Sequence, residues 1–162
     1  MSEPKPPPIL LIEDDRDVQA AMRNLLEANG YTVLTASDGR EGLLYLRGGV
    51  RPAVILLDLR MPVMDGATFR IEQSRDAALR TIPVVVLSAD AAVGRSLVFD
   101  GVPQYRKPLD AEELLRIVAQ YASARPATPP RASSADVEIE IREKASRISR
   151  GRRLLRGRRS PR

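Results

Sequence analysis

Side chains that could bind a cation or act as a nucleophile follow the apolar segments of this chain in a regular way. Three short apolar runs end in acidic or hydroxyl residues, and a Lys-Pro pair follows a fourth, weaker segment. The residues in question are Glu13 and Asp14, then Asp58, then Ser88, and finally Lys107 and Pro108. If the runs are neighbouring parallel strands, their carboxyl ends meet at one edge of a sheet. Carboxylates gathered there repel one another unless a cation joins them. The pattern therefore predicts one reaction centre built around a cation.

The elements that must position these residues can be read from two periodicities. Apolar runs of about four residues are too short for helices and are typical of buried strands. We predict strands over residues 9–12, 31–36, 54–57 and 82–87, and a fifth, weaker one before Lys107. Amphipathic patterns predict helices over residues 17–29, 37–48, 66–79, 90–100 and 110–121. Five strands that alternate with five helices indicate an α/β fold, with a doubly wound parallel sheet and helices on both faces. The first, third and fourth strands should be central, because they are apolar throughout.

Composition excludes several kinds of chemistry. The 162 residues include no cysteine and no histidine. Disulfides, thiolate metal sites, Ser-His catalysis and a histidine phosphodonor are therefore excluded for this chain. No apolar run approaches the ~20 residues needed to span a bilayer, and the first eight residues do not form a signal peptide. We therefore expect a cytoplasmic protein without a membrane span.

Charge divides the chain into two parts. Residues 1–122 carry 14 basic and 17 acidic side chains, a balance of −3, whereas residues 123–162 carry 12 and 4, a balance of +8. We predict a disordered N-terminus over residues 1–7, one domain over residues 8–122, and an irregular linker over residues 123–135 that is rich in Ala, Pro, Ser and Thr. Residues 136–162 then form a basic tail. Val137, Ile141 and Ile148 fall on a helical stripe, but Gly151 and Gly157 limit any helix to a short, marginal one, and the tail is otherwise disordered.

Residues 8–122 resemble the receiver domain of bacterial response regulators, of the chemotaxis-regulator type. The motifs that carry this resemblance are Ile-Leu-Leu-Ile-Glu13-Asp14, Asp58-Leu-Arg-Met61-Pro62-Val-Met-Asp65-Gly66, Leu-Ser88-Ala89 and Lys107-Pro108. The resemblance implies a flavodoxin-like strand order of 2-1-3-4-5. It also implies that Asp58 accepts a phosphoryl group from a histidine kinase or a phosphotransfer protein.

The resemblance assigns further roles within the site. Magnesium, which prefers oxygen ligands, would be held by Asp14 and Asp58, by Glu13 through water, and by the backbone carbonyl of Arg60. Lys107 would offer its charge to Asp58 and later to the phosphoryl oxygens, and Ser88 would donate its hydroxyl to the phosphoryl group. A cis peptide bond before Pro108 would orient Lys107. Asp15 is not assigned to the metal site, because it lies one position beyond the matching pair Glu13-Asp14. It is better explained as a residue that favours the start of a helix.

One part of the pattern departs from the family. Receiver domains place a switch aromatic three residues before the lysine, but Gln104 stands there and Tyr105 is only two residues before Lys107. Because side chains alternate along a strand, Tyr105 should point to the opposite face from a residue at position 104. The segment from Ser88 to Lys107 is also about three residues shorter than the family pattern. We therefore expect a truncated fourth helix, and signalling through another face or through a weaker conformational change.

These patterns favour a stand-alone receiver that signals through phosphorylation-dependent contact with an unidentified downstream protein. It would not be an enzyme, apart from magnesium-dependent self-phosphorylation and slow self-dephosphorylation. The alternative couples the receiver to nucleic acid through the arginine-rich tail, because a +8 balance attracts phosphates without regard to sequence. The tail lacks aromatic residues for stacking, so a tail in solvent, or one in contact with the domain's own acidic crevice, competes with this interpretation. A magnesium-dependent phosphatase with an aspartyl intermediate is disfavoured, because such enzymes place an Asp-x-Asp pattern after the first strand.

Overall fold

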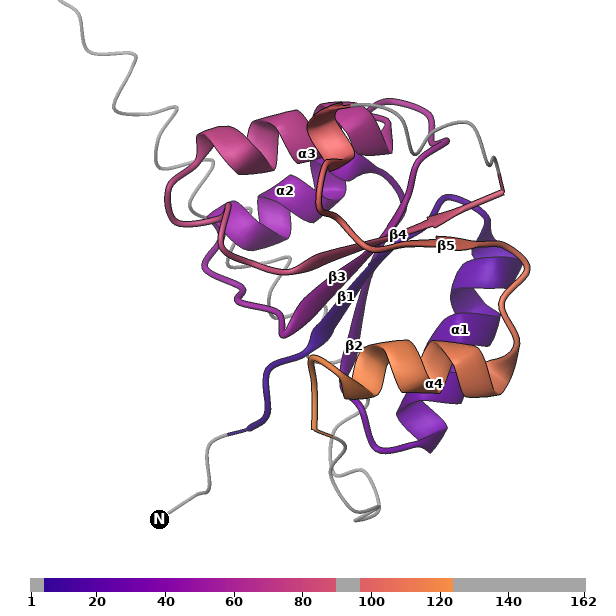
Figure 1. Cartoon of the computed structure of the whole chain (residues 1–162). Coiled ribbons are helices and arrows are strands. Elements are labelled where there is room, and N and C mark those ends of the chain that lie inside the picture. Colours follow the sequence, from indigo (N-terminus) through magenta and orange to yellow (C-terminus); the bar gives the residue numbers. More distant parts are fainter. Residues whose placement is uncertain (1–4, 90–96, 124–162) are drawn as a thin grey trace, which may run out of the picture.

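A five-stranded parallel sheet forms the centre of the molecule (Figure 1). The computed structural model describes residues 5–89 and 97–123. Within these ranges the strands are β1 (Ile9–Ile12), β2 (Val33–Ala36), β3 (Val54–Asp58), β4 (Val84–Ser88) and β5 (Gln104–Arg106). Their order across the sheet is β2-β1-β3-β4-β5, and each neighbouring pair is parallel. The predicted doubly wound sheet with strand order 2-1-3-4-5 is confirmed.

The three apolar runs occupy the interior of the sheet, as predicted. Each of β1, β3 and β4 has a strand on both sides, and all their residues are buried. A strand covered by helices on both faces buries both rows of side chains, which explains runs that do not alternate with polar residues. The edge strand β5 has only three residues, and the outer two are exposed. Its sequence signal is weak for that reason.

Four α-helices connect the strands in the part of the chain that the structure describes. They are α1 (Arg16–Ala28), α2 (Gly39–Arg47), α3 (Gly66–Arg75) and α4 (Ala111–Ala119). Each is preceded by an aspartate whose side chain accepts a hydrogen bond from a backbone N–H of the first turn; these caps are Asp15, Asp38, Asp65 and Asp110. A cap of this kind stabilises a helix by about 1 kcal/mol. The caps therefore fix each helix start shortly after the carboxyl end of a strand.

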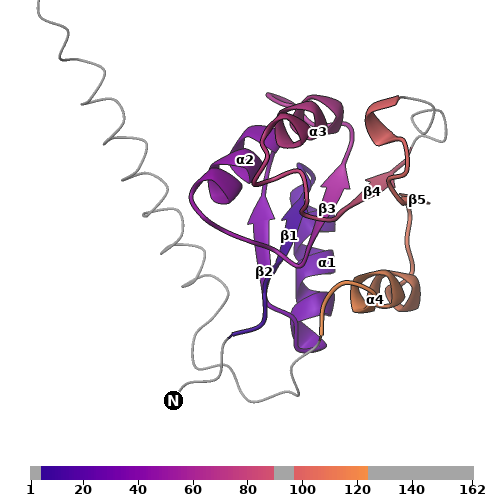
Figure 2. The same cartoon turned by 60° about the vertical axis from the view of Figure 1, so that its left-hand side comes forward.

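The helices cover the sheet in two layers, α1 and α4 on one face and α2 and α3 on the other (Figure 2). On the first face, the helices bury an apolar row against the strands; this row consists of Leu26, Leu114, Ile117 and Val118. On the second face, the corresponding helix residues are Leu43, Leu46 and Phe69. Each fully buried aliphatic side chain contributes about 1.5–3 kcal/mol relative to an exposed one. The sheet is thereby held rigid beneath the site at its carboxyl edge.

Some predicted boundaries differ from the structure. The second strand starts at Val33 rather than at residue 31, and the fourth runs from Val84 to Ser88 rather than over residues 82–87. The third helix was expected over residues 66–79, but α3 ends at Arg75. Beyond it the chain turns, and the N–H groups of Leu79 and Arg80 donate to the carbonyl of Asp76.

The fourth predicted helix, over residues 90–100, coincides only in part with described residues. Residues 90–96 lie outside the described ranges. Residues Leu97–Phe99 form a single 3-10 turn, labelled η2, and Phe99 is buried in the cluster beneath α2 and α3. The end of the predicted helix is therefore replaced by one tight turn that leads to β5.

Most residues of the predicted N-terminal segment, linker and tail lie outside the part of the chain that the structure describes. Residues 5–8 contain no helix or strand, and residues 1–4 and 124–162 fall outside the described ranges. Disorder at the N-terminus, the linker over residues 123–135 and the marginal helix of the tail therefore stay predictions. Among the helices that the structure describes, none has the length and apolar character required to cross a membrane.

Candidate functional site

Three carboxylates meet at the carboxyl edge of β1 and β3. Glu13 and Asp14 directly follow β1, and Asp58 is the last residue of β3. These strands pair with Ile12 opposite Leu57, so their ends lie side by side. Carboxylate oxygens of the three acidic residues lie within 4.8 Å of one another. The structure thus brings together the acidic residues that the sequence placed at one edge.

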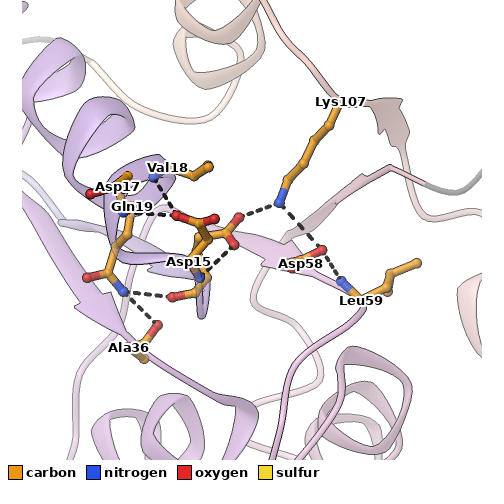
Figure 3. Close-up of polar contacts among 9 residues, drawn as sticks. Asp15, Asp17, Val18, Gln19, Ala36, Asp58, Leu59 and Lys107 are labelled. Carbon is orange, nitrogen blue, oxygen red and sulfur yellow. Dashed lines mark hydrogen bonds and ion pairs between the residues drawn. The ribbon is translucent and has the colours of Figure 1, made fainter.

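Lys107 supplies positive charge to this acidic cluster. It follows β5, and Figure 3 shows its side chain extended toward Asp58. Its Nζ lies 3.5 Å from Asp58 Oδ1 and donates a hydrogen bond to Glu13 Oε2. The ion pair with Glu13 is a contact that the sequence did not predict. Lys107 therefore forms ion pairs with two of the three carboxylates, those of Glu13 and Asp58.

The backbone at Lys107 links the last two strands of the sheet. The Lys107 N–H donates to the carbonyl of Ser88 at 2.9 Å, and the peptide bond between Lys107 and Pro108 is cis, as the resemblance implied. Ser88 is the last residue of β4 and is buried. Because Leu87 stands opposite Asp58 in the β3–β4 pairing, Ser88 lies at the same edge as the acidic cluster.

Asp58 is nearly buried, and a hydrogen bond orients its side chain. It is 9% exposed, and its Oδ1 accepts a hydrogen bond of 2.7 Å from the backbone N–H of Leu59. Asp58 thus combines limited contact with water, a neighbouring cation and a fixed side-chain orientation.

Glu13 is the most deeply buried acid of the three. It is 2% exposed, and burial raises the pKa of its carboxyl above the ordinary value of 4.5. The negative charge of Asp58 raises this pKa further, whereas the hydrogen bond and the charge of Lys107 act in the opposite direction. Removal from water favours the neutral acid, and this effect outweighs the lysine.

Two neighbouring residues fix the loop that carries Glu13 and Asp14. Asp15 accepts hydrogen bonds from the N–H groups of Asp17 and Val18, which confirms its predicted place at a helix start (Figure 3). Gln19 donates through Nε2 to the carbonyls of Glu13 at 2.8 Å and Ala36 at 3.1 Å. Gln19 thereby ties the ends of β1 and β2 together. This role was not predicted, because a single glutamine in the first turns of a helix has no distinctive sequence pattern.

The loop between β3 and α3 is shaped by close backbone contacts. A Cβ atom on Gly66 would come within 2.5 Å of the Asp58 carbonyl oxygen and 2.9 Å of the Leu59 Cα, so a side chain cannot fit without a shift of the backbone. The Gly66 N–H donates to the Leu59 carbonyl at 3.0 Å. Gly66 is therefore more than a turn residue, because its missing side chain lets α3 begin against the residue that ends β3.

Val63 in the same loop adopts an unusual conformation. Its φ of 67° lies in the left-handed region, which is costly for a β-branched residue. The side chain is 76% exposed, so burial does not compensate for this strain. Strained residues of this kind concentrate at functional sites.

Tyr105, the candidate switch aromatic, is half-buried, whereas Arg60, whose carbonyl is a candidate metal ligand, is exposed. Tyr105 is half-buried and packs with the cluster beneath α1 and α4, whereas its neighbours Gln104 and Arg106 are exposed. This arrangement agrees with the expected one-residue offset, and any role of Tyr105 in switching stays a prediction. Arg60 is exposed in the loop after β3, and metal binding by its carbonyl also stays a prediction.

The donor set fits a hard divalent cation. Glu13, Asp14 and Asp58 offer carboxylate oxygens close enough to share one ion, and Asp14 is exposed, so water can complete the coordination. Magnesium is typically bound by one or two carboxylates together with waters and phosphate oxygens. Three carboxylates with one lysine also leave an excess of negative charge that a divalent ion would neutralise.

Comparison with known proteins identifies the class. The family model of the response regulator receiver domain matches residues 9–119, which is more than half of the chain. The chain belongs to the response regulator receiver domain family of two-component signalling.

Particular relatives support this assignment. The response regulator MprA of Mycolicibacterium vanbaalenii is 39% identical over an alignment of 110 residues that covers 66% of this chain and 46% of MprA. The transcriptional regulatory protein PrrA of Mycobacterium leprae is 32% identical over an alignment of 150 residues that covers 88% of this chain and 63% of PrrA. The chain thus spans less than two thirds of the length of these relatives.

Solved structures agree in fold. The receiver domain of a sensor histidine kinase from Pseudomonas aeruginosa PAO1 is 30% identical, with a TM-score of 0.63 over 71% of this chain and 96% of that domain. That structure has a magnesium ion coordinated in its active site cleft. The chemotaxis response regulator CheY4 of Vibrio cholerae is 26% identical, with a TM-score of 0.63 over 71% of this chain and 98% of CheY4.

Proposed function

We propose that Asp58 is the phosphoacceptor of this receiver and takes a phosphoryl group from a histidine kinase or a phosphotransfer protein. The observation that carries this proposal is the placement of Asp58, which ends β3 beside Glu13 and Asp14 and lies 3.5 Å from the Lys107 ammonium. A carboxylate that attacks an anionic donor is repelled by it, so nearby positive charge is required to offset the repulsion. Lys107 provides a positive charge beside one carboxylate oxygen of Asp58.

The proposed reaction is a transfer between two nucleophiles. A carboxylate oxygen of Asp58 attacks phosphorus, so that a P–O bond forms while the P–N bond of a donor phosphohistidine breaks. The electron pair of that bond returns to the imidazole of the donor. Asp58 then carries a mixed anhydride, which water hydrolyses slowly, and no external substrate is turned over.

The other residues of the site act on charge and orientation. Lys107 would pair with the phosphoryl oxygens, and the Ser88 hydroxyl would donate to one of them from the end of β4. Magnesium, held by Asp14, Asp58 and the Arg60 carbonyl and by Glu13 through water, would supply the remaining positive charge. Leu59 fixes one oxygen of Asp58 through its N–H, at 2.7 Å. The signal would then pass to a downstream protein by contact.

Intact mass measurement after incubation with acetyl phosphate and magnesium tests this proposal. Wild type should gain the mass of one phosphoryl group, and Asp58→Ala should not. Asp15→Asn is the matched control, because an asparagine keeps the helix cap and Asp15 lies outside the reacting set; it should gain the group like wild type. A phosphoryl group on Asp58→Ala would overturn the assignment.

A further inference from the structure

An apolar groove separates α1 from α4 on one face of the molecule. Its volume is about 440 Å³. The walls come from the two helices and the floor from the end of β4; the apolar lining includes Val18, Ala21, Met22, Leu25, Leu87 and Leu114. Lys107 and Asp110 are the charged residues that line it, so one end adjoins the candidate phosphorylation site. An apolar surface of this kind marks a place where another segment or protein binds.

The chain that continues beyond the described residues starts at the far end of the helix that forms one wall of this groove. Helix α4, which forms one wall, ends at Ala119, and the described chain ends four residues later at Ser123. Figure 2 shows that the chain leaves α4 near the amino ends of the strands, away from the reacting edge. Thirteen residues, the number between Ser123 and Val137, are enough for a coil to span about 20 Å. Since α4 with its nine residues is about 13.5 Å long, the tail can reach the groove without being stretched.

The tail sequence has an apolar stripe of matching length. Val137, Ile141 and Ile148 recur at helical spacing, and most of the residues between them are polar or charged, with Ile139 and Ala145 as the exceptions. At 1.5 Å per residue, the stripe from Val137 to Ile148 would be about 16 Å long. It therefore has the length and the apolar character needed to fill a groove bounded by α4.

Charge complementarity favours the same occupant and fixes its direction. Residues 147–162 include eight arginines and no acidic residue. Asp110 lines the groove, and the segments that begin α1 and α4 carry further exposed acidic residues; these are Asp14, Asp15, Asp17 and Glu112, against the exposed basic residues Arg16 and Arg106 at the same edge of the sheet. A tail that enters from the end of α4 and runs back along it would bring these arginines to that acidic edge. Opposite charges at short range would then add to the apolar contact.

We propose that residues 137–148 bind the groove between α1 and α4 of the same molecule, with the arginines that follow beside its acidic edge. The bound tail would cover the wall that contains Lys107. The contact needs no phosphoryl group on Asp58, so it can be tested whether or not that residue is phosphorylated.

Paramagnetic broadening of amide signals tests this contact in the full chain. The chain has no cysteine, so Ser146→Cys would carry a single nitroxide label, on the side of the stripe away from the groove. We expect selective broadening of the amide signals of Val18, Met22, Leu25 and Leu114, with those of α2 and α3 much less affected. Broadening that is absent, or equal on both faces of the sheet, would overturn the proposal.

Variants on both sides of the contact provide the controls. Ile141→Ser combined with Ile148→Ser should abolish the selective broadening. On the groove side, Ala21→Arg should abolish it, because the long cation fills the groove and repels the arginines. Ala20→Arg is the matched control, since Ala20 is an exposed residue of the same helix outside the groove lining, and it should leave the broadening unchanged. Equal effects of the two arginine variants would contradict the assigned groove.

A mixture of labelled and isotope-enriched chains identifies which molecule supplies the tail. Enriched chains without the label should show no selective broadening when unenriched, labelled chains are added. Broadening in that mixture would mean that a second copy donates its tail, and the proposal of a contact within one molecule would be wrong.

Discussion

At the scale of single residues, Lys107 contacts the oxygens that a metal ion would need, so it should compete with such an ion. Its ammonium is hydrogen-bonded to Glu13 and lies 3.5 Å from Asp58. Lys107→Met should therefore tighten magnesium binding, by roughly fivefold or about 1 kcal/mol, while slowing phosphorylation of Asp58 by acetyl phosphate. Titration calorimetry gives the affinity, with the exposed Lys5→Met as the control for a lost charge. Weaker magnesium binding by Lys107→Met would show that the lysine supports the ion rather than competing with it.

The raised pKa of Glu13 makes the effect of magnesium dependent on pH. Because burial raises the pKa in the folded protein above 4.5, the contribution of Glu13 to stability is complete below that value. It is lost as the pH rises through the raised pKa, because the ionised group is then buried. A bound divalent ion favours the ionised form, so the increase in Tm caused by magnesium should grow from about pH 5 to about pH 7.5. Thermal unfolding at both pH values measures this, and Glu13→Gln should reduce the difference between them.

The left-handed conformation of Val63 stores strain that a substitution can remove. Asparagine tolerates a positive φ far better than valine, and the exposed side chain contributes little packing. Val63→Asn should raise the free energy of unfolding by about 1 kcal/mol, as measured by urea denaturation. Val63→Thr separates polarity from backbone conformation, because threonine is polar but still β-branched. If both variants gain the same stability, backbone strain is not the cause.

At the scale of elements, Gln73 determines how α3 is joined to β4. It is fully buried, and its Nε2 donates to the carbonyls of Leu79 at 3.0 Å and Ile82 at 3.1 Å. Gln73→Leu would leave both carbonyls without this donor and should cost about 1–3 kcal/mol of unfolding free energy. Chemical denaturation measures the loss. The neighbouring Ser74→Ala removes a hydrogen bond on the exposed side of the helix and should cost much less.

The elements were predictable wherever one local pattern decided the structure. The apolar runs identified β1, β3 and β4, because a strand buried on both faces has no polar alternation. Helix α3 was predicted to end at Leu79, and Ala77 and Ala78 in the predicted last turn are good helix formers. The chain leaves the helix earlier, and the carbonyls of that turn are bound by Gln73, a tertiary contact with no local signature. Within the site, the meeting of Glu13, Asp14 and Asp58 followed from strand order. The roles of Gln19 and of the Glu13–Lys107 pair depend on distant partners and were not predictable.

At the scale of the whole molecule, the position of Tyr105 indicates that a conformational change caused by phosphorylation would reach α1 and α4. Its ring packs with the cluster beneath α1 and α4, and Lys107 lines the groove between these helices. Beryllofluoride, as a mimic of the phosphoryl group, should therefore change amide exchange in α1 and α4 of wild type, but not of Asp58→Ala. Hydrogen exchange read by mass spectrometry measures this. Changes confined to residues 97–106 would mean that the signal leaves through the opposite face of β5.

The short edge strand has a consequence for self-association. β5 pairs with β4 on one side and has only three residues, with Gln104 and Arg106 exposed. Continuation of a sheet from one molecule into the next needs a long, flat row of unpaired backbone groups, which charged and very short edge strands do not provide. The exposed edge of β5 therefore disfavours strand pairing between molecules. Concentrated solutions should resist fibre formation that starts from β5.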